Sequence, residues 1–174
     1  MNRLTTPQGT FELARFPEHP RDPFQAWDAA DTYLLQELAD PETGPVDLSG
    51  TVAVVGDRWG ALATALAAHR PVQIGDSYLG RRATLANLAR NGLDRDAVGL
   101  LSSRDTPPDR IDVLLVRVPK SMFTGARTAL RQGGELWVVG NRHLSYHTHL
   151  RRIFGNCTTV AGDPKFVVLR AVKR

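Results

Sequence analysis

Thr51-Val-Ala-Val-Val-Gly-Asp-Arg-Trp-Gly60 is the most informative stretch of the chain, because an apolar strand here runs directly into a turn that carries two glycines. The segment 59–69 that follows is rich in Ala and Leu and favours a helix, and 71–76 favours a second strand. A strand, a helix and another strand in this order form a βαβ unit. The stretch therefore predicts a parallel sheet covered by helices.

The same alternation continues to the end of the chain. Further helices are predicted at 78–91, 122–131 and 143–154, and further strands at 98–102, 111–118, 135–140, 158–161 and 165–172. A strand as uniformly apolar as 111–118 is buried on both faces, as in a parallel sheet. Gly162-Asp-Pro164 joins the last two strands and favours a hairpin. We therefore predict an α/β, Rossmann-like fold with a mostly parallel, doubly wound sheet of seven strands and a C-terminal antiparallel hairpin.

The segment before this pattern has a different character. Pro17, Pro20 and Pro23 hold the chain extended, a helix is predicted over 24–38, and the Pro- and Gly-containing segment 40–45 ends it. We expect an N-terminal extension with its helix at 1–48 and an α/β domain at 49–174, which together form one compact domain.

The apolar runs and the cysteine content indicate the cellular compartment of the protein. The apolar runs are far shorter than the roughly 20 residues that a membrane-spanning helix requires, and the stretch Met1 to Thr10 has no positively charged flank before an apolar run. Cys157 is the single cysteine, so it forms neither an internal disulfide nor a zinc cluster built from cysteines. These features predict a cytoplasmic protein without a membrane partner or a structural metal.

Positive charge is concentrated at the C-terminal end. Residues 1–80 hold five Arg and eleven acidic residues, whereas 141–174 hold seven Lys or Arg against Asp163 alone. A basic surface of this kind can neutralise phosphates and bind a nucleic acid, although the same side chains can also merely solvate exposed helices. The candidate RNA-binding residues here are Arg142, Arg151, Arg152 and Lys165, with Arg170, Lys173 and Arg174 beside them.

Several long segments carry a resemblance to a known family. They are Gln25-Ala-Trp-Asp-Ala-Ala-Asp-Thr-Tyr-Leu34, Ile74-Gly-Asp-Ser-Tyr78, Ala86-Asn-Leu-Ala-Arg-Asn-Gly92 and Val116-Arg-Val-Pro-Lys120, followed by Gly134-Glu-Leu-Trp-Val-Val-Gly-Asn-Arg-His-Leu144, Phe154-Gly-Asn-Cys-Thr-Thr159 and Lys165-Phe-Val-Val-Leu-Arg-Ala-Val-Lys173. The first four resemble the N-terminal half of the large-subunit ribosomal RNA guanine-N2 methyltransferases, and the last three resemble the extreme C-terminus of the same family. The resemblance implies a class I methyltransferase fold, S-adenosylmethionine as cofactor and ribosomal RNA as partner.

This family normally has two methyltransferase-like domains in tandem, of which the first is degenerate and the second catalytic. A chain of 174 residues has room for one. The resemblance therefore implies a hybrid, in which the front of the degenerate domain is joined near 131–134 to the last strand, helix and hairpin of the catalytic domain.

The turn after the first strand departs from the cofactor-binding pattern that the resemblance implies, acidic-x-Gly-x-Gly-x-Gly. Val54 stands at the acidic position and Arg58 at the middle glycine, while Gly56 and Gly60 remain. These two glycines are candidate cofactor contacts, although they also suit a tight turn and close helix packing. Asp57 is a candidate replacement acid or a cap of the next helix.

Asp76 follows the second strand, about twenty residues after the glycines, where an acidic residue binds a cofactor ribose. Asp76 is therefore the fourth candidate cofactor residue, after Gly56, Asp57 and Gly60. Its alternative is a helix cap, made by Asp76 or by Ser77.

The resemblance implies an Asn-Pro-Pro-Phe motif after the fourth strand, where the asparagine accepts from the target amino group. This chain has Arg117-Val-Pro-Lys120 instead. An arginine side chain has donors and no acceptor, and lysine offers no ring on which a base can stack. We therefore assign no catalytic residue. Arg117 and Lys120 remain candidates for phosphate binding, with salt bridges to carboxylates as the alternative.

His143 and His147 are four residues apart and would share a helix face, but no carboxylate lies near them in the sequence. A capping or surface role is expected, and no metal site is assigned.

Two hypotheses follow. The first is a non-catalytic member of the family, an RNA-binding or assembly module that keeps the fold and a basic face. The second is an active ribosomal RNA guanine-N2 methyltransferase that binds its cofactor in an unusual way through Asp76 and Asp57. A homodimer is also predicted, because a domain without its tandem neighbour exposes apolar surface. The candidate interface contains Phe11, Phe16, Phe24 and Trp27, which could instead pack on their own sheet.

Overall fold

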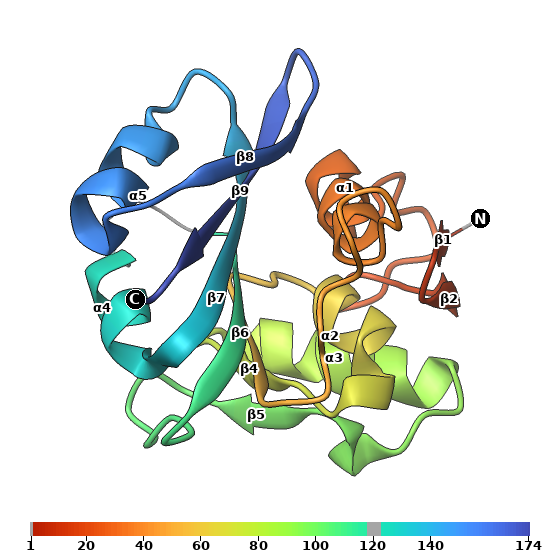
Figure 1. The fold of residues 1–174 in the computed structure, drawn as a ribbon. Coiled ribbons are helices and arrows are strands. Elements are labelled where there is room, and N and C mark those ends of the chain that lie inside the picture. The colour runs from red at the N-terminus through yellow and green to blue at the C-terminus, as the bar shows by residue number, and fades with distance from the viewer. Residues whose placement is uncertain (1, 118–122) are drawn as a thin grey trace.

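The computed structural model describes residues 2–117 and 123–174 (Figure 1). Its main sheet contains seven strands in the order β5-β4-β3-β6-β7-β9-β8. They are β3 (Val52–Val55), β4 (Val72–Ile74), β5 (Gly99–Leu101), β6 (Ile111–Val116), β7 (Leu130–Asn141), β8 (Thr158–Gly162) and β9 (Phe166–Val172). β9 runs antiparallel to β7 and β8, and the other neighbouring pairs are parallel. The predicted fold class is therefore confirmed.

Helices cover both faces of the sheet (Figure 1). α1 (Ala29–Leu38) and α2 (Ala61–Ala65) pack on one face, with α3 (Tyr78–Arg90) beside α2, whereas α4 (Phe123–Ala129) and α5 (Tyr146–Phe154) pack on the other. Alternate residues of β3 pack on opposite faces of the sheet. Val52 and Val54 belong to the core on the side of α1 and α2, and Ala53 belongs to the core on the side of α4 and α5. Because both faces are buried, the strand has no polar alternation.

A short antiparallel hairpin at the N-terminus was not predicted. It consists of β1 (Arg3–Thr6) and β2 (Gly9–Glu12). Strands of four residues leave too little periodicity for a sequence pattern to detect. The segment after the hairpin is fixed by the buried Asn87 of α3, whose Oδ1 accepts from the Ala14 amide at 2.9 Å and whose Nδ2 donates to the Ala14 carbonyl at 3.0 Å.

Several predicted helix boundaries were wrong. The helix predicted over 24–38 begins at Ala29, because Asp28 forms a capping box with Asp31. The helix predicted over 59–69 is the five-residue α2 followed by a 3-10 turn (Ala67–His69). α5 begins at Tyr146, so His143 lies outside the helix and does not share a helix face with His147.

The predicted junction at 131–134 lies inside β7, which begins at Leu130 and is longer than expected. A 3-10 turn (Arg95–Ala97) precedes β5. Among the described residues, no helix is long and apolar enough to cross a membrane, and no group of three metal-ligating side chains occurs in the described ranges.

Candidate functional site

The turn after β3 is shaped by two glycines with left-handed backbone conformations. Gly56 has φ of 83° and Gly60 has φ of 78°, values that residues with a Cβ rarely adopt. At Gly60, an added Cβ would lie 2.3 Å from Oγ1 of Thr84 on α3. Gly60 therefore allows α3 to approach the start of α2, which is a packing role.

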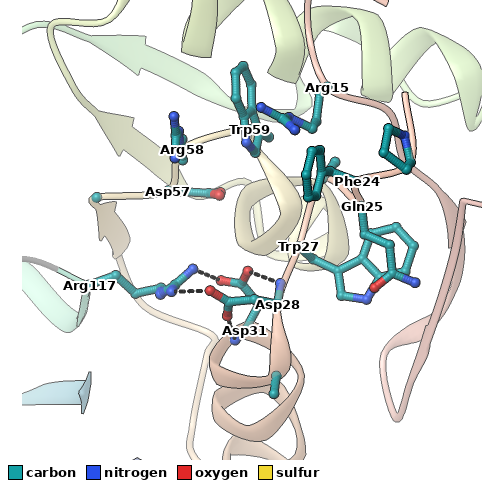
Figure 2. Close-up of a pocket in the computed structure, with 14 residues that line it drawn as sticks. Arg15, Phe24, Gln25, Trp27, Asp28, Asp31, Asp57, Arg58, Trp59 and Arg117 are labelled. Atoms are coloured by element: carbon teal, nitrogen blue, oxygen red, sulfur yellow. Dashed lines mark hydrogen bonds and ion pairs between the residues drawn. The ribbon is translucent and has the colours of Figure 1, made fainter. Parts of the chain in front are cut away.

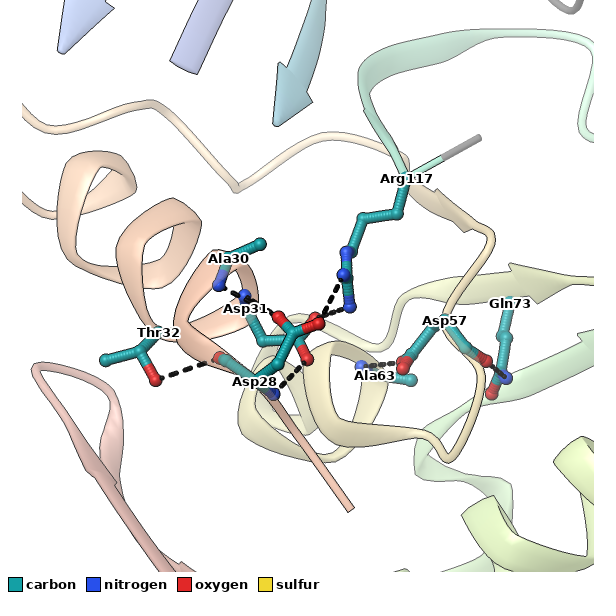
Figure 3. Close-up of polar contacts among 8 residues, drawn as sticks. All are labelled: Asp28, Ala30, Asp31, Thr32, Asp57, Ala63, Gln73 and Arg117. Atoms are coloured by element: carbon teal, nitrogen blue, oxygen red, sulfur yellow. Dashed lines mark hydrogen bonds and ion pairs between the residues drawn. The ribbon is translucent and has the colours of Figure 1, made fainter. Parts of the chain in front are cut away.

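Asp57 is buried within this turn and points toward the start of α2 (Figure 3). Its Oδ2 accepts from the Ala63 amide at 2.8 Å, and its backbone carbonyl accepts from Nε2 of Gln73 at 3.1 Å. Burial, followed by the nearby charge of Asp31, raises the pKa of Asp57 to about 7. The Asp57 carboxyl group therefore accepts hydrogen bonds at the N-terminus of α2.

Arg117 follows β6 and reaches across to the N-terminus of α1 (Figure 3). Its Nη1 donates to Oδ1 of Asp31 at 2.7 Å, and its Nη2 donates to Oδ2 of Asp28 at 2.8 Å. Burial raises the pKa of Asp31, and the positive charge of Arg117 opposes that rise. The structure thus places Arg117 in salt bridges, the alternative to phosphate binding, and Lys120 lies outside the described residues.

Asp28 and Asp31 have no free carboxylate oxygen. Oδ1 of Asp28 accepts from the amides of Ala30 and Asp31, at 2.8 and 3.2 Å, and Oδ2 of Asp31 accepts from the Asp28 amide at 3.0 Å. Sequence reasoning missed both residues as partners of Arg117. The spacing Asp28-x-x-Asp31 was the available signal, because it is close to a capping-box pattern.

Asp76 is exposed after β4 and connects two strand ends. Its Oδ1 accepts from the Ser103 amide at 2.8 Å, and hydrogen bonds from Ser103 lower its pKa. The cap of α3 is Ser77, whose Oγ accepts from the Gly80 amide at 3.0 Å. Asp76 therefore braces the loop after β5, and Ser77 takes the capping role.

A cavity of about 810 Å³ opens where β3 and β6 end (Figure 2). Its lining combines aromatic rings with charged groups, and includes Arg15, Phe24, Trp27, Asp28, Asp31, Asp57, Arg58, Trp59 and Arg117. Of the candidate cofactor residues, Gly56 and Asp57 lie on this cavity and Gly60 and Asp76 do not. The structure therefore brings two of the four together.

The candidate RNA-binding residues divide into two groups. The Arg142 amide donates to the Lys165 carbonyl at 3.0 Å, which places these two exposed residues together where β7 meets the β8–β9 hairpin. Arg151 and Arg152 lie on the exposed surface of α5, and among the residues that the structure describes neither has a salt-bridge partner. Arg170 is less available, because it pairs with Glu135.

The order of the sheet and the position of the cavity at its carboxyl edge define a class I methyltransferase-like domain. A solved structure with the same fold is the T. thermophilus 16S ribosomal RNA N2 G1207 methyltransferase, in complex with AdoMet and guanosine. The TM-score is 0.82 at 23% sequence identity, over 99% of this chain and 50% of that one.

The sequence comparisons give the family. The family model described as RLMG N-terminal domain matches residues 1–130, and the one described as methyltransferase small domain matches residues 105–170. The Streptomyces coelicolor ribosomal RNA large subunit methyltransferase G is 64% identical over 156 residues, which cover 87% of this chain and 41% of that protein. This chain belongs to the ribosomal RNA large subunit methyltransferase G family.

The comparison with the Streptomyces griseus relative of the same description shows how much of the relative's length this chain spans. The alignment is 41% identical over 384 positions and covers 100% of both chains, so more than half of its positions have no residue of this chain. The chain spans less than half the length of the S. coelicolor relative. The match to the RLMG N-terminal domain ends at residue 130, next to the predicted junction.

The residues present do not fit S-adenosylmethionine well. The buried, apolar Val54 occupies the acidic position, Arg58 occupies the middle glycine position, and the Asp57 carboxyl group serves α2. The cavity offers no carboxylate that is free of a protein partner among its described lining residues.

Proposed function

We propose that this chain is a non-catalytic, RNA-binding member of the ribosomal RNA large subunit methyltransferase G family. The observation that carries the proposal is the position of Arg117 and the pairing of its guanidinium with two carboxylates. It stands where the family resemblance implies an asparagine that accepts from the target amine, and its donors are held by Asp28 and Asp31. A guanidinium cannot accept a hydrogen bond, so the group that would direct an exocyclic amine toward a methyl donor is missing.

Weak cofactor binding is the second part of the proposal. Gly56 and Gly60 keep the shape of the turn, but Asp57 is already hydrogen-bonded and Asp76 braces Ser103. Asp76 also lies outside the lining of the cavity, away from Gly56 and Asp57. We therefore expect S-adenosylmethionine to bind at millimolar concentration or more weakly.

Ribosomal RNA is the proposed partner. The candidate phosphate-binding surface is formed by Arg151 and Arg152 on α5, together with Arg142 and Lys165 beside β8. Lys120 was also predicted to bind phosphate, but it lies outside the described residues. Exposed arginines without carboxylate partners can bind phosphates at little desolvation cost. This is why the arginines of α5 support RNA binding better than Arg170 does.

An active ribosomal RNA guanine-N2 methyltransferase is the second candidate. It is favoured by the description of the relatives as ribosomal RNA large subunit methyltransferases. In this alternative, Asp76 and Asp57 would hold the cofactor in an atypical way.

One experiment separates the two candidates. Ribosomal RNA is incubated with this chain and S-adenosylmethionine that carries a labelled methyl group, with the full-length S. griseus relative as positive control. The proposal expects the RNA to be retained by the chain without transfer of label. Label transfer that is lost in Asp76→Ala would establish the active enzyme, and absence of RNA retention at low salt would refute RNA binding.

Homodimer formation and a cytoplasmic location stay predictions. Phe11 and Trp27 pack against the core cluster that contains α1, which supports the alternative that this segment covers its own domain, whereas Phe24 is 64% exposed. Light scattering at micromolar concentration tests the dimer. Trp27→Asp should abolish it if this segment forms the interface, and a monomer would refute it.

A further inference from the structure

Four side chains form an alternating stack of cations and aromatic rings at the rim of the 810 Å³ cavity. The Arg58 guanidinium lies 5.2 Å from the centre of the Trp59 ring, and the Arg15 guanidinium lies 5.1 Å from the same ring. Arg15 also lies 5.3 Å from the centre of the Phe24 ring. Figure 2 shows Trp59 between the two arginines and Arg15 between the two rings. We call Arg58, Trp59, Arg15 and Phe24 the cation–aromatic stack.

Both ends of the stack are open to solvent. Phe24 is 64% exposed, and Arg58 is exposed as well. Arg15 has a carboxylate partner, Asp22, at 3.5 Å, but Arg58 has no salt bridge among the described residues. In the described part of the chain, the stack thus ends in an exposed aromatic ring and in a cation without a counter-ion.

The backbone of Phe24 is fixed by a hydrogen bond, and its exposed ring lies against Arg15. The Phe24 amide donates to Oδ1 of Asp22 at 3.0 Å, and Asp22 also pairs with Arg15, on which the ring stacks. A ring that served only the core would be buried, as Phe123 is on the opposite face of the sheet. Contacts that restrict an exposed aromatic ring before binding reduce the conformational entropy that is lost when a base stacks on it.

We propose that the cation–aromatic stack binds a short stretch of unpaired RNA, with a base on the open face of Phe24 and a phosphate on Arg58. This proposal rests on the proposed function as an RNA-binding protein and adds a site separate from the α5 surface. Unpaired bases stack on aromatic rings and on guanidinium planes, and arginine binds phosphate. A duplex hides the base faces, so the site selects single strands. A free nucleotide has the same chemistry and is the alternative source.

The test is fluorescence anisotropy with a labelled, ten-nucleotide single-stranded RNA, and with the same strand annealed to its complement. Phe24→Ala should weaken binding of the single strand about 5-fold to 150-fold, the range for removal of one stacked base. Phe24→Trp should retain the affinity. Arg58→Gln should weaken binding and reduce the salt slope by about one. Tyr78→Ala removes an aromatic ring that is also 64% exposed and should change the affinity less than 2-fold.

The outcomes distinguish this site from the proposed function as a whole. RNA binding that depends on Arg151 and Arg152 but is unchanged by Phe24→Ala refutes the stack and leaves the proposed function intact. Absence of RNA binding by the unmodified chain refutes both. Equal affinity for single strand and duplex also refutes the stack. A titration with guanosine monophosphate, followed by tryptophan fluorescence, tests whether a free nucleotide is the ligand. If guanosine monophosphate binds as tightly as the ten-nucleotide strand, the proposal that the stack binds RNA is contradicted.

Discussion

Nη1 of Arg117 lies 2.7 Å from Oδ1 of Asp31, and this contact ties the end of β6 to the first turn of α1 (Figure 3). Asp31 is 2% exposed, so its charge has little contact with water and depends on the arginine. At the position where the family resemblance implies a substrate-binding asparagine, the chain therefore has a structural ion pair.

Removing the guanidinium should destabilise the fold. Arg117→Met leaves Asp31 buried without its cation, and we expect the free energy of unfolding to fall by about 2–3 kcal/mol, between the values typical of surface and buried pairs. Urea unfolding followed by circular dichroism measures the change. Arg127→Ala, an exposed arginine of α4, is the control and should have an effect below about 0.5 kcal/mol. Equal stability of Arg117→Met and the parent would show that the ion pair contributes nothing net.

Asp57 should make the stability depend on pH in the acid to neutral range. Its pKa is raised to about 7 in the folded chain, so between about pH 4 and 7 the folded state binds more protons than the unfolded state does. The contribution of this group to stability therefore decreases as pH rises through that window and is constant above it. Asp57→Asn, whose amide oxygen can still accept from Ala63, should lose less stability between pH 5 and 8 than the parent. Thermal unfolding of both proteins at pH 5 and pH 8 tests the sign of this pH dependence. An equal loss of stability in Asp57→Asn and in the parent would contradict it.

Gly60 should not tolerate a side chain. Its φ of 78° and the 2.3 Å approach of an added Cβ to Thr84 predict that Gly60→Ala lowers the free energy of unfolding by about 2–4 kcal/mol. Gly125 of α4 provides the matched control, because an added Cβ there meets nothing within 4 Å. Gly125→Ala should be neutral or raise stability by up to about 1 kcal/mol. Similar effects of the two substitutions in urea unfolding would refute the packing role of Gly60.

The α5 arginines should contribute to RNA affinity through charge. Changing Arg151 and Arg152 together to Ala should weaken RNA binding and reduce the slope of log affinity against log salt by about two, near one for each phosphate that is no longer neutralised. Filter binding at several salt concentrations measures the slope. An unchanged slope would show that these arginines only solvate the helix.

The sheet could be predicted from the sequence because its strands are apolar and the turns between them contain glycine or proline. Val52 and Ala53 illustrate this, since neighbours on opposite faces are both buried and the strand is a continuous apolar run. The helix boundaries were harder to predict, because a cap such as Asp28 depends on one side chain and not on a period.

The site was only partly predictable. The replacement at Arg117 could be recognised from the family resemblance, and its chemistry follows from the side chain alone. Its partners could not, because Asp31 is 86 residues away in the sequence and meets Arg117 only after the sheet and α1 have packed. The cation–aromatic stack was missed for the same reason, since Arg15 and Trp59 come from segments far apart in the chain.

Calorimetric titration with S-adenosylmethionine is the sharpest test of whether this chain keeps the methyltransferase fold without a working cofactor site. We predict a dissociation constant in the millimolar range or weaker for the unmodified chain, and an improvement in Arg58→Gly larger than in any other single variant of the turn. Micromolar binding by the unmodified chain that disappears in Asp76→Ala would contradict this prediction.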